Sequence, residues 1–142
     1  MKETEKAKNL LDDKITFAAV GEKGIYTSEK RGVAPILEKI DTDPEFFKGT
    51  SVADRVIGKA AAMLLCKYGV SEIYARVTSE YAIAYLSDKK TVLTYDKIVD
   101  HIINRLGTDM CPMEKAVLNV NDADEGERLF LMSTTPTRAK GL

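Results

Sequence analysis

The stretch DMCPMEKAV, residues 109–117, contains the side chains best suited to chemistry. Cys111 directly precedes Pro112, and proline is favoured at the first position of a helix, so Cys111 is predicted to be the N-cap. There the helix dipole lowers the pKa of a thiol and raises the fraction of reactive thiolate. Glu114 falls in the first turn, where it could act as a general base or only stabilise the helix. Capping alone explains the cysteine poorly, since sulfur accepts hydrogen bonds weakly.

A second set of candidates lies in SVADRVIGKAAAMLLCKYG, residues 51–69. Its apolar spacing predicts one long helix, with Ser51 as N-cap and Asp54 at the third position, where Asp54 could cap the helix or carry a proton. Arg55 and Lys59 are four residues apart, so they would share a helix face that binds a phosphate or carboxylate, or simply meets solvent. The GK pair lacks the earlier glycine of a phosphate-binding loop, which excludes that motif.

Strands and helices are predicted to alternate around these stretches. Before the long helix, the pattern indicates a charged helix, a two-strand hairpin closed by GEKG, and a short helix, over residues 3–12, 15–28 and 33–40. After it come a strand, a helix and a strand, over residues 72–78, 79–90 and 91–95. This alternation is typical of parallel strands joined by right-handed crossovers.

The C-terminal part is predicted to be helical. An apolar stripe ended by a glycine indicates a helix over residues 98–106, and two shorter helices follow over residues 111–120 and 122–132. The predicted fold is a three-layer α/β/α domain with a mixed sheet of about four strands and an N-terminal hairpin. All 142 residues fit a single domain, residues 1–142, in which residues 134–142 form a flexible tail.

Three predicted helix starts should meet at one edge of this sheet. They begin the segments SVAD, TSEY and CPME, residues 51–54, 78–81 and 111–114. Helices that follow parallel strands start at the carboxyl ends of those strands, where ligands usually bind. Their free N–H groups and positive dipole ends favour an anion or a thiolate.

Composition excludes several classes of protein. The chain has 21 basic and 22 acidic residues and a net charge of −1, which argues against nucleic-acid binding. Its apolar runs are far shorter than the ~20 residues of a membrane span, so a cytoplasmic protein is expected. Two cysteines and one histidine provide neither a disulfide framework nor a structural zinc site, and Cys66 is expected in the core. No metal and no cofactor are predicted.

The segments SVADRVIGKAAAMLL, VTSEYAIAYL and INRLGTDMCPMEKAV, in this order, resemble an uncharacterised prokaryotic family of unknown function. The resemblance covers about residues 10–131 and implies a cytidine-deaminase-like fold. Carried over onto this sequence, the family pattern implies a set of site residues on four segments. They are Asp54, Arg55, Gly58 and Lys59, then Ser79 and Glu80, then Asn104 and Arg105, and finally Cys111 and Glu114.

Zinc deaminases require a His or Cys ligand with a nearby Glu, and a Pro-Cys-x-x-Cys motif on the next helix. These ligands are missing here, so ordinary zinc deamination is not expected. The leading hypothesis is a metal-independent enzyme, a cysteine-dependent hydrolase or transferase. Cys111 would be its nucleophile, and Glu114 or Asp54 would move protons.

The ligand of such an enzyme is expected to be a small, anionic, nucleotide-like molecule. Its substrate-binding residues would be Arg55, Lys59, Ser79, Glu80, Asn104 and Arg105. The alternatives are a non-catalytic sensor or regulatory module and a redox-sensing thiol protein. Homo-oligomerisation stays open at this stage.

Overall fold

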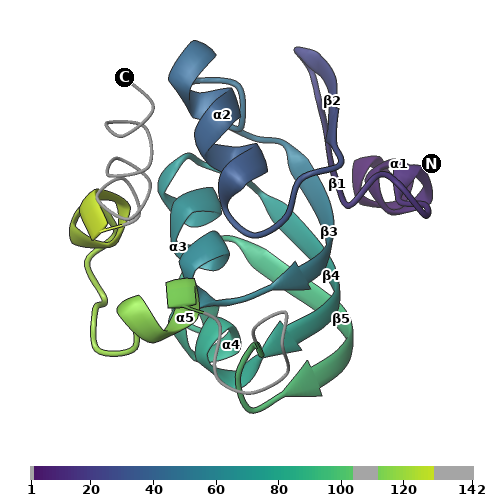
Figure 1. Cartoon of the computed structure of the whole chain (residues 1–142). Coiled ribbons are helices and arrows are strands. Elements are labelled where there is room, and N and C mark those ends of the chain that lie inside the picture. Colours follow the sequence, from purple (N-terminus) through teal and green to yellow (C-terminus); the bar gives the residue numbers. More distant parts are fainter. Residues whose placement is uncertain (1, 104–111, 130–142) are drawn as a thin grey trace, which may run out of the picture.

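The computed structural model of the protein describes residues 2–103 and 112–129 (Figure 1). Its elements in chain order are α1 (Glu3–Leu10), β1 (Phe17–Gly21), β2 (Gly24–Ser28), α2 (Ala34–Thr42), β3 (Ser51–Ile57), α3 (Lys59–Lys67), β4 (Glu72–Ser79), α4 (Glu80–Leu86), β5 (Val92–Val99) and α5 (Pro112–Ala116). Residues 123–129 are also helical.

The five strands form one mixed sheet in the order β2-β1-β3-β4-β5. β1 runs antiparallel to both of its neighbours, β2 and β3, whereas β3, β4 and β5 are parallel. The predicted N-terminal hairpin and the α/β class are therefore confirmed. The parallel strands bring their carboxyl ends to the same edge of the sheet, and α3 and α4 begin at that edge.

Residues 51–57 form the central strand β3 and not the first half of a long helix. The predicted helix over residues 51–69 is thus wrong in its first half, because α3 begins only after Gly58. β3 is largely buried between β1 and β4, and over so short a segment the spacing of its four apolar residues also fits one face of a helix. Ser51 is therefore a strand residue rather than an N-cap, and Asp54 is not in a helical turn. With this additional strand the sheet has five strands rather than about four.

β5 continues to Val99, although the sequence predicts a helix over residues 98–106. That prediction is wrong for residues 98–103, and the last three residues of the predicted helix lie outside the described part. Ile98 and Val99 pair with the end of β4. A neighbouring strand with free hydrogen-bonding groups thus prevails over the helix-like spacing of these apolar side chains.

The remaining predicted elements are confirmed within the described residues. α1, α2, α4 and the two strands β4 and β5 all overlap the segments predicted for them. α5 begins at Pro112, as the N1 preference of proline implies. Of the last predicted helix, residues 123–129 are helical in the structure. No helix in the described ranges has both the length and the apolar content of a membrane span.

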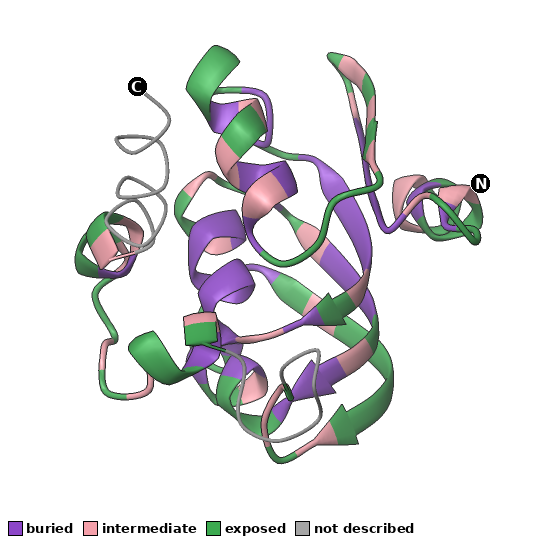
Figure 2. Cartoon of the chain, in the orientation of Figure 1, coloured by how far each residue is buried: buried purple, intermediate pink, exposed green. Residues whose placement is uncertain are grey.

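Helices cover the two faces of the sheet unequally (Figure 1). The main core lies between the sheet and the helices α2, α3, α4 and α5, and includes the completely buried side chains of Phe17, Phe47 and Leu64. On the opposite face α1 is the one helix of the described residues that packs over β1, β3 and β4, through a smaller core that includes Ala7 and Tyr74. Figure 2 shows the resulting burial, deepest in the central strands and in α3.

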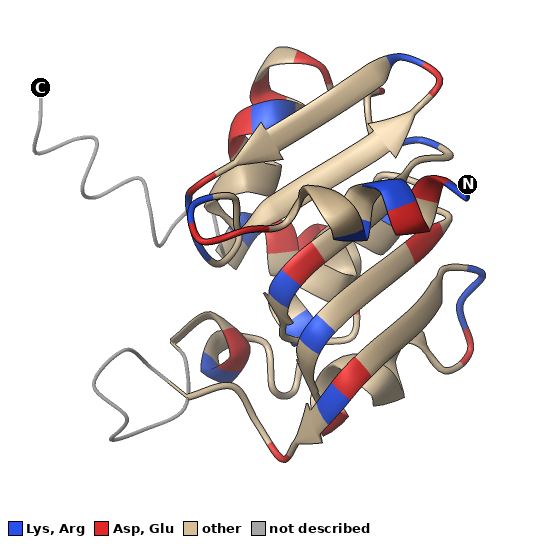
Figure 3. Cartoon of the chain, turned by 90° about the vertical axis from the view of Figure 1, so that its right-hand side faces the viewer, with Lys and Arg blue, Asp and Glu red and all other residues tan. Residues whose placement is uncertain are grey.

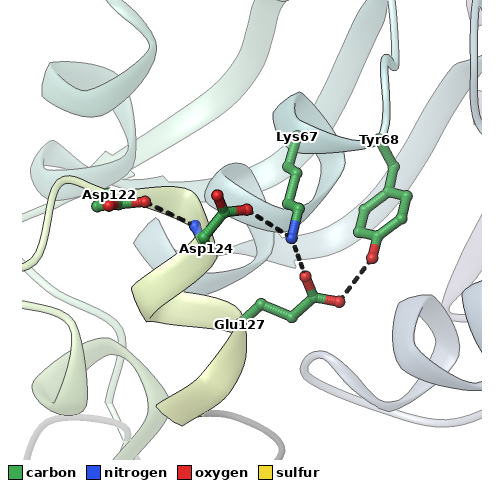
Figure 4. A network of polar contacts seen from close by, with 5 residues as sticks. All are labelled: Lys67, Tyr68, Asp122, Asp124 and Glu127. Atoms are coloured by element: carbon green, nitrogen blue, oxygen red, sulfur yellow. Dashed lines mark hydrogen bonds and ion pairs between the residues drawn. The ribbon is translucent and has the colours of Figure 1, made fainter.

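The helical residues 123–129 are fastened to the end of α3 by the polar network in Figure 4. The Lys67 ammonium pairs with Asp124 at 2.8 Å and also with Glu127. The Tyr68 hydroxyl donates to the second carboxylate oxygen of Glu127 at 2.6 Å. Burial, together with the Glu127 carboxylate, raises the pKa of Tyr68 to about 12. Tyr68 therefore stays a neutral hydrogen-bond donor throughout the physiological range.

Candidate functional site

A cavity of about 800 Å³ opens at the edge of the sheet where β3 ends and α3 begins. Its wall also includes the residues before β1 and α2, the residues after β5, and the start of α5. The polar lining residues are Thr16, Arg31, Asp54, Arg55 and Glu114, and the apolar ones include Val33, Val56, Ala60, Ala61, Ile102, Ile103 and Met113. The cavity is thus mostly apolar with a few polar groups, the usual character of a small-molecule site.

Asp54 brings a buried carboxyl group to the wall of this cavity. Its side chain is held by the central strand β3, and the residue is only 6% exposed. Its one side-chain hydrogen bond found in the described residues is a long one, from the Val56 N–H at 3.4 Å. Burial raises the pKa of Asp54 well above its ordinary value, although nearby backbone N–H groups and Arg55 act in the opposite direction. Asp54 therefore keeps its proton to a higher pH than an exposed aspartate.

Two arginines also line the cavity, and they differ in their surroundings. The Arg55 guanidinium donates to the carbonyl of Asp12, while its buried Nε has no hydrogen-bond partner in the described structure. Arg31 is exposed and belongs to the turn before α2, and it forms no ion pair with any described residue. Arg55 forms no ion pair with a described residue either, so both arginines of this cavity are available to an anionic group.

Glu114 is the most strongly bound polar group of the site. Its carboxylate accepts the Lys59 N–H at 2.7 Å, the Ile102 N–H at 2.6 Å and the hydroxyl of Ser79, and the residue is 1% exposed. Lys59 begins α3 and Ser79 caps α4, accepting the Ala82 N–H at 3.1 Å. Hydrogen bonds to a carboxylate are stronger than those between neutral groups, and three of them converge on Glu114. One carboxylate thus joins the starts of two helices and the chain after β5.

Gly58 allows this carboxylate to come close to α3. A Cβ atom at position 58 would lie 2.8 Å from Glu114 Oε2 and 3.0 Å from the Ile102 side chain. The backbone of Gly58 has a negative φ of −95°, which other residues also adopt, so the requirement for glycine is one of space. The family-implied glycine is therefore explained by its neighbour Glu114.

Other predicted site residues point elsewhere. The Lys59 ammonium donates to the Leu118 carbonyl at 3.1 Å and to Asn121 Oδ1 at 3.2 Å, and burial lowers its pKa. Lys59 and Glu80 are not among the cavity-lining residues, and Glu80 is exposed in the first turn of α4. The structure thus brings Asp54, Arg55 and Glu114 to the cavity, and uses Lys59 to hold the chain that follows α5.

Three predicted site residues, Asn104, Arg105 and Cys111, lie outside the described residues. Of the three predicted helix starts, those of α3 and α4 meet at Glu114, but the first begins at Gly58 and not at Ser51. Sequence reasoning missed Thr16 and Arg31 at the cavity, since both lie in connecting segments whose path depends on the fold. In the described ranges, no group of three His, Cys, Asp or Glu side chains is arranged to hold a metal ion.

The chain matches one known protein family over most of its length. The model of the TM1506-type domain of unknown function (DUF1893) matches residues 5–131. The chain belongs to the DUF1893 family. A solved DUF1893 structure, from Thermotoga maritima, has 28% sequence identity and a TM-score of 0.82, over 92% of this chain and 89% of that chain. No curated protein matches. The DUF1893 match includes every residue that lines the cavity.

The contact between Glu114 and Gly58 predicts that substitutions at these two positions have non-additive effects on the free energy of unfolding. Glu114→Ala should lower the free energy of unfolding by about 3 kcal/mol, because it leaves buried donors without a partner. Gly58→Ala should lower it by ~1–3 kcal/mol, since the new methyl group meets the carboxylate. In the Glu114→Ala background, the loss caused by Gly58→Ala should be smaller, as measured by urea unfolding of the four proteins. Equal losses in both backgrounds would contradict the assigned contact.

Asp54→Asn should raise the free energy of unfolding at neutral pH, because an uncharged amide replaces a buried acid. The folded-state pKa of Asp54 lies above its ordinary 3.8, so its stabilising contribution is full below that pH and is lost as the pH rises through the folded-state pKa. Urea unfolding at several pH values should show that the free energy of unfolding of Asp54→Asn increasingly exceeds that of the wild type as the pH rises from acidic to neutral. The exposed Asp13→Asn is the control, and a pH-independent difference between wild type and Asp54→Asn would refute the assignment.

Proposed function

We propose that the cavity binds a small organic ligand and that Asp54 exchanges a proton or a hydrogen bond with it. The observation that carries the proposal is the buried, weakly partnered carboxyl of Asp54 in the wall of a large and mostly apolar cavity. A buried polar group without a good partner destabilises the folded state, and such groups concentrate at functional sites. A ligand that completes its hydrogen bonds would remove this deficit.

The groups around the cavity favour a nucleotide-like ligand. A protonated carboxyl offers an O–H donor beside a C=O acceptor, which complements the adjacent donor and acceptor on the edge of a nucleobase. Apolar side chains such as Val33, Ala61 and Met113 offer surfaces for a flat ring. Arg31 can pair with a phosphate without first breaking an ion pair to the described residues. Nucleoside monophosphates combine these three features.

We extend the proposal to a cytidine-deaminase-like fold and to metal-independent chemistry at Cys111. The mixed sheet with helices on both faces, and a cavity where β3 meets α3, support this fold. Pro112 is part of the cavity wall, which supports a role for the residue directly before it. In this proposal Cys111 is the nucleophile of a hydrolase or transferase. Asp54 carries the proton, because the Glu114 carboxylate is already engaged by three donors.

Binding of nucleoside monophosphates should raise the melting temperature of the protein, because a ligand of the folded state stabilises it. Asp54→Ala should abolish this shift, whereas Asp54→Asn should retain it, since an amide also offers one donor and one acceptor. Arg31→Ala should weaken monophosphate binding about tenfold or more without weakening that of the nucleoside. The exposed Lys90→Ala is the control. Absence of any shift with purine and pyrimidine monophosphates at millimolar concentration would exclude this ligand class.

Cys111 should react with iodoacetamide faster than Cys66, with an apparent pKa below the ~8.5 of a free thiol. A bound monophosphate should protect it, and Cys111→Ser should remove the fast phase. The measurement is alkylation followed by mass spectrometry across a pH series. An ordinary thiol pKa at Cys111 would rule out its role as the nucleophile. If the ligand still bound, the protein would be a binding or sensor module and not an enzyme.

A further inference from the structure

β5 is an edge strand whose outer side is free in the described part of the chain. It pairs with β4 alone, and no other described segment follows its outer edge. Six of its eight residues are exposed. Figure 2 shows this strand mostly green, in contrast to its buried neighbours. An edge strand of this length exposes backbone N–H and C=O groups that can accept a further strand.

The side chains of β5 are unusually apolar for an exposed edge. Val92 is 54% exposed, Tyr95 44% and Ile98 45%. α1 lies over β1, β3 and part of β4, and on that face no described helix covers β5 (Figure 3). The strand also carries one acidic and one basic residue in succession, Asp96 and Lys97, so its charge is balanced. These features suit a partner strand of similar composition.

We propose that this partner is β5 of a second copy of the chain, paired antiparallel about a twofold axis, so that two sheets become one. Residues directly opposite in an antiparallel pair project from the same face of the sheet. A twofold axis perpendicular to the sheet must therefore pass through one residue position. Only two such registers pair seven of the eight residues of β5, one centred on Tyr95 and the other on Asp96.

Charge decides between the two registers. Centring on Asp96 places two like carboxylates directly opposite each other, which is destabilising. Centring on Tyr95 stacks the two tyrosines across the axis and places Asp96 opposite Thr94 of the second copy. The same register places Val92 opposite Ile98, twice, so the most exposed apolar side chains of the strand cover each other. The Tyr95-centred register therefore avoids the repulsion between carboxylates and also buries the exposed apolar side chains.

The first test is the mass of the full-length protein in solution, measured by light scattering over a range of concentrations. We expect a dimer. Ile98→Lys should shift the protein to a monomer, while Ile25→Lys, the same change at a more exposed isoleucine on the opposite edge strand β2, should leave the dimer intact. Circular dichroism of each variant checks that it folds. A monomer at all concentrations, or a dimer that resists Ile98→Lys, would overturn the proposal.

The second test reads the register with single cysteines in a Cys66→Ser, Cys111→Ser background. Tyr95→Cys should form an intermolecular disulfide under mild oxidation, because the two positions face each other across the axis within the Cα reach of a disulfide. Asp96→Cys should not, since its two copies would be offset by about 7 Å along the strands. Cross-linking through Asp96→Cys, without cross-linking through Tyr95→Cys, would refute the Tyr95-centred pairing. Neither test depends on ligand binding, so the dimer proposal can fail while the proposed function stands.

Discussion

The buried carboxylate of Glu114 is the contact on which the arrangement of the site depends. It accepts hydrogen bonds from the first residue of α3, from the cap of α4 and from the chain that leaves β5. These three segments follow three neighbouring parallel strands, so their relative positions determine the shape of the sheet edge. A single charged group can satisfy all three because a carboxylate has two oxygens and about four acceptor positions. The glycine beside it leaves room for the contact.

Asp54 and Glu114 are two buried acids at one cavity that differ in their hydrogen-bond partners. Glu114 accepts hydrogen bonds from three donors, two backbone N–H groups and the Ser79 hydroxyl. Asp54 projects from the middle of a buried strand, where its partners among the described residues are weak backbone N–H contacts, and burial raises its pKa. A fully engaged acid and a weakly partnered one at the same cavity are suited to different roles, one structural and one toward a ligand. Here Glu114 holds the helices of the site in place, and Asp54 is left to interact with a ligand.

The sequence predicted well those elements whose signals are local. The hairpin around its glycine-bounded turn, the helix start at Pro112 and the helix start in TSEY depend on a few adjacent residues, and the structure contains all three. It failed at β3 and at the end of β5, where the decisive factor is a neighbouring strand that lies far away in the sequence. The cavity was predicted at the correct edge, and Asp54 and Glu114 were selected. Arg31 and Thr16 carry no local signal, since their place at the cavity follows from how the hairpin packs against β3.

The segment 112–129 is tied to both ends of α3. Glu114 holds the first residue of the helix, and Glu127 binds Lys67 and Tyr68 at its far end (Figure 4). α3 has nine residues and is therefore about 13 Å long, so the segment acts as a strap along its whole length. A rigid helix held at both ends cannot tilt or slide without breaking one attachment. The cavity wall at the start of α3 is thus mechanically connected to the polar network at the other end of that helix.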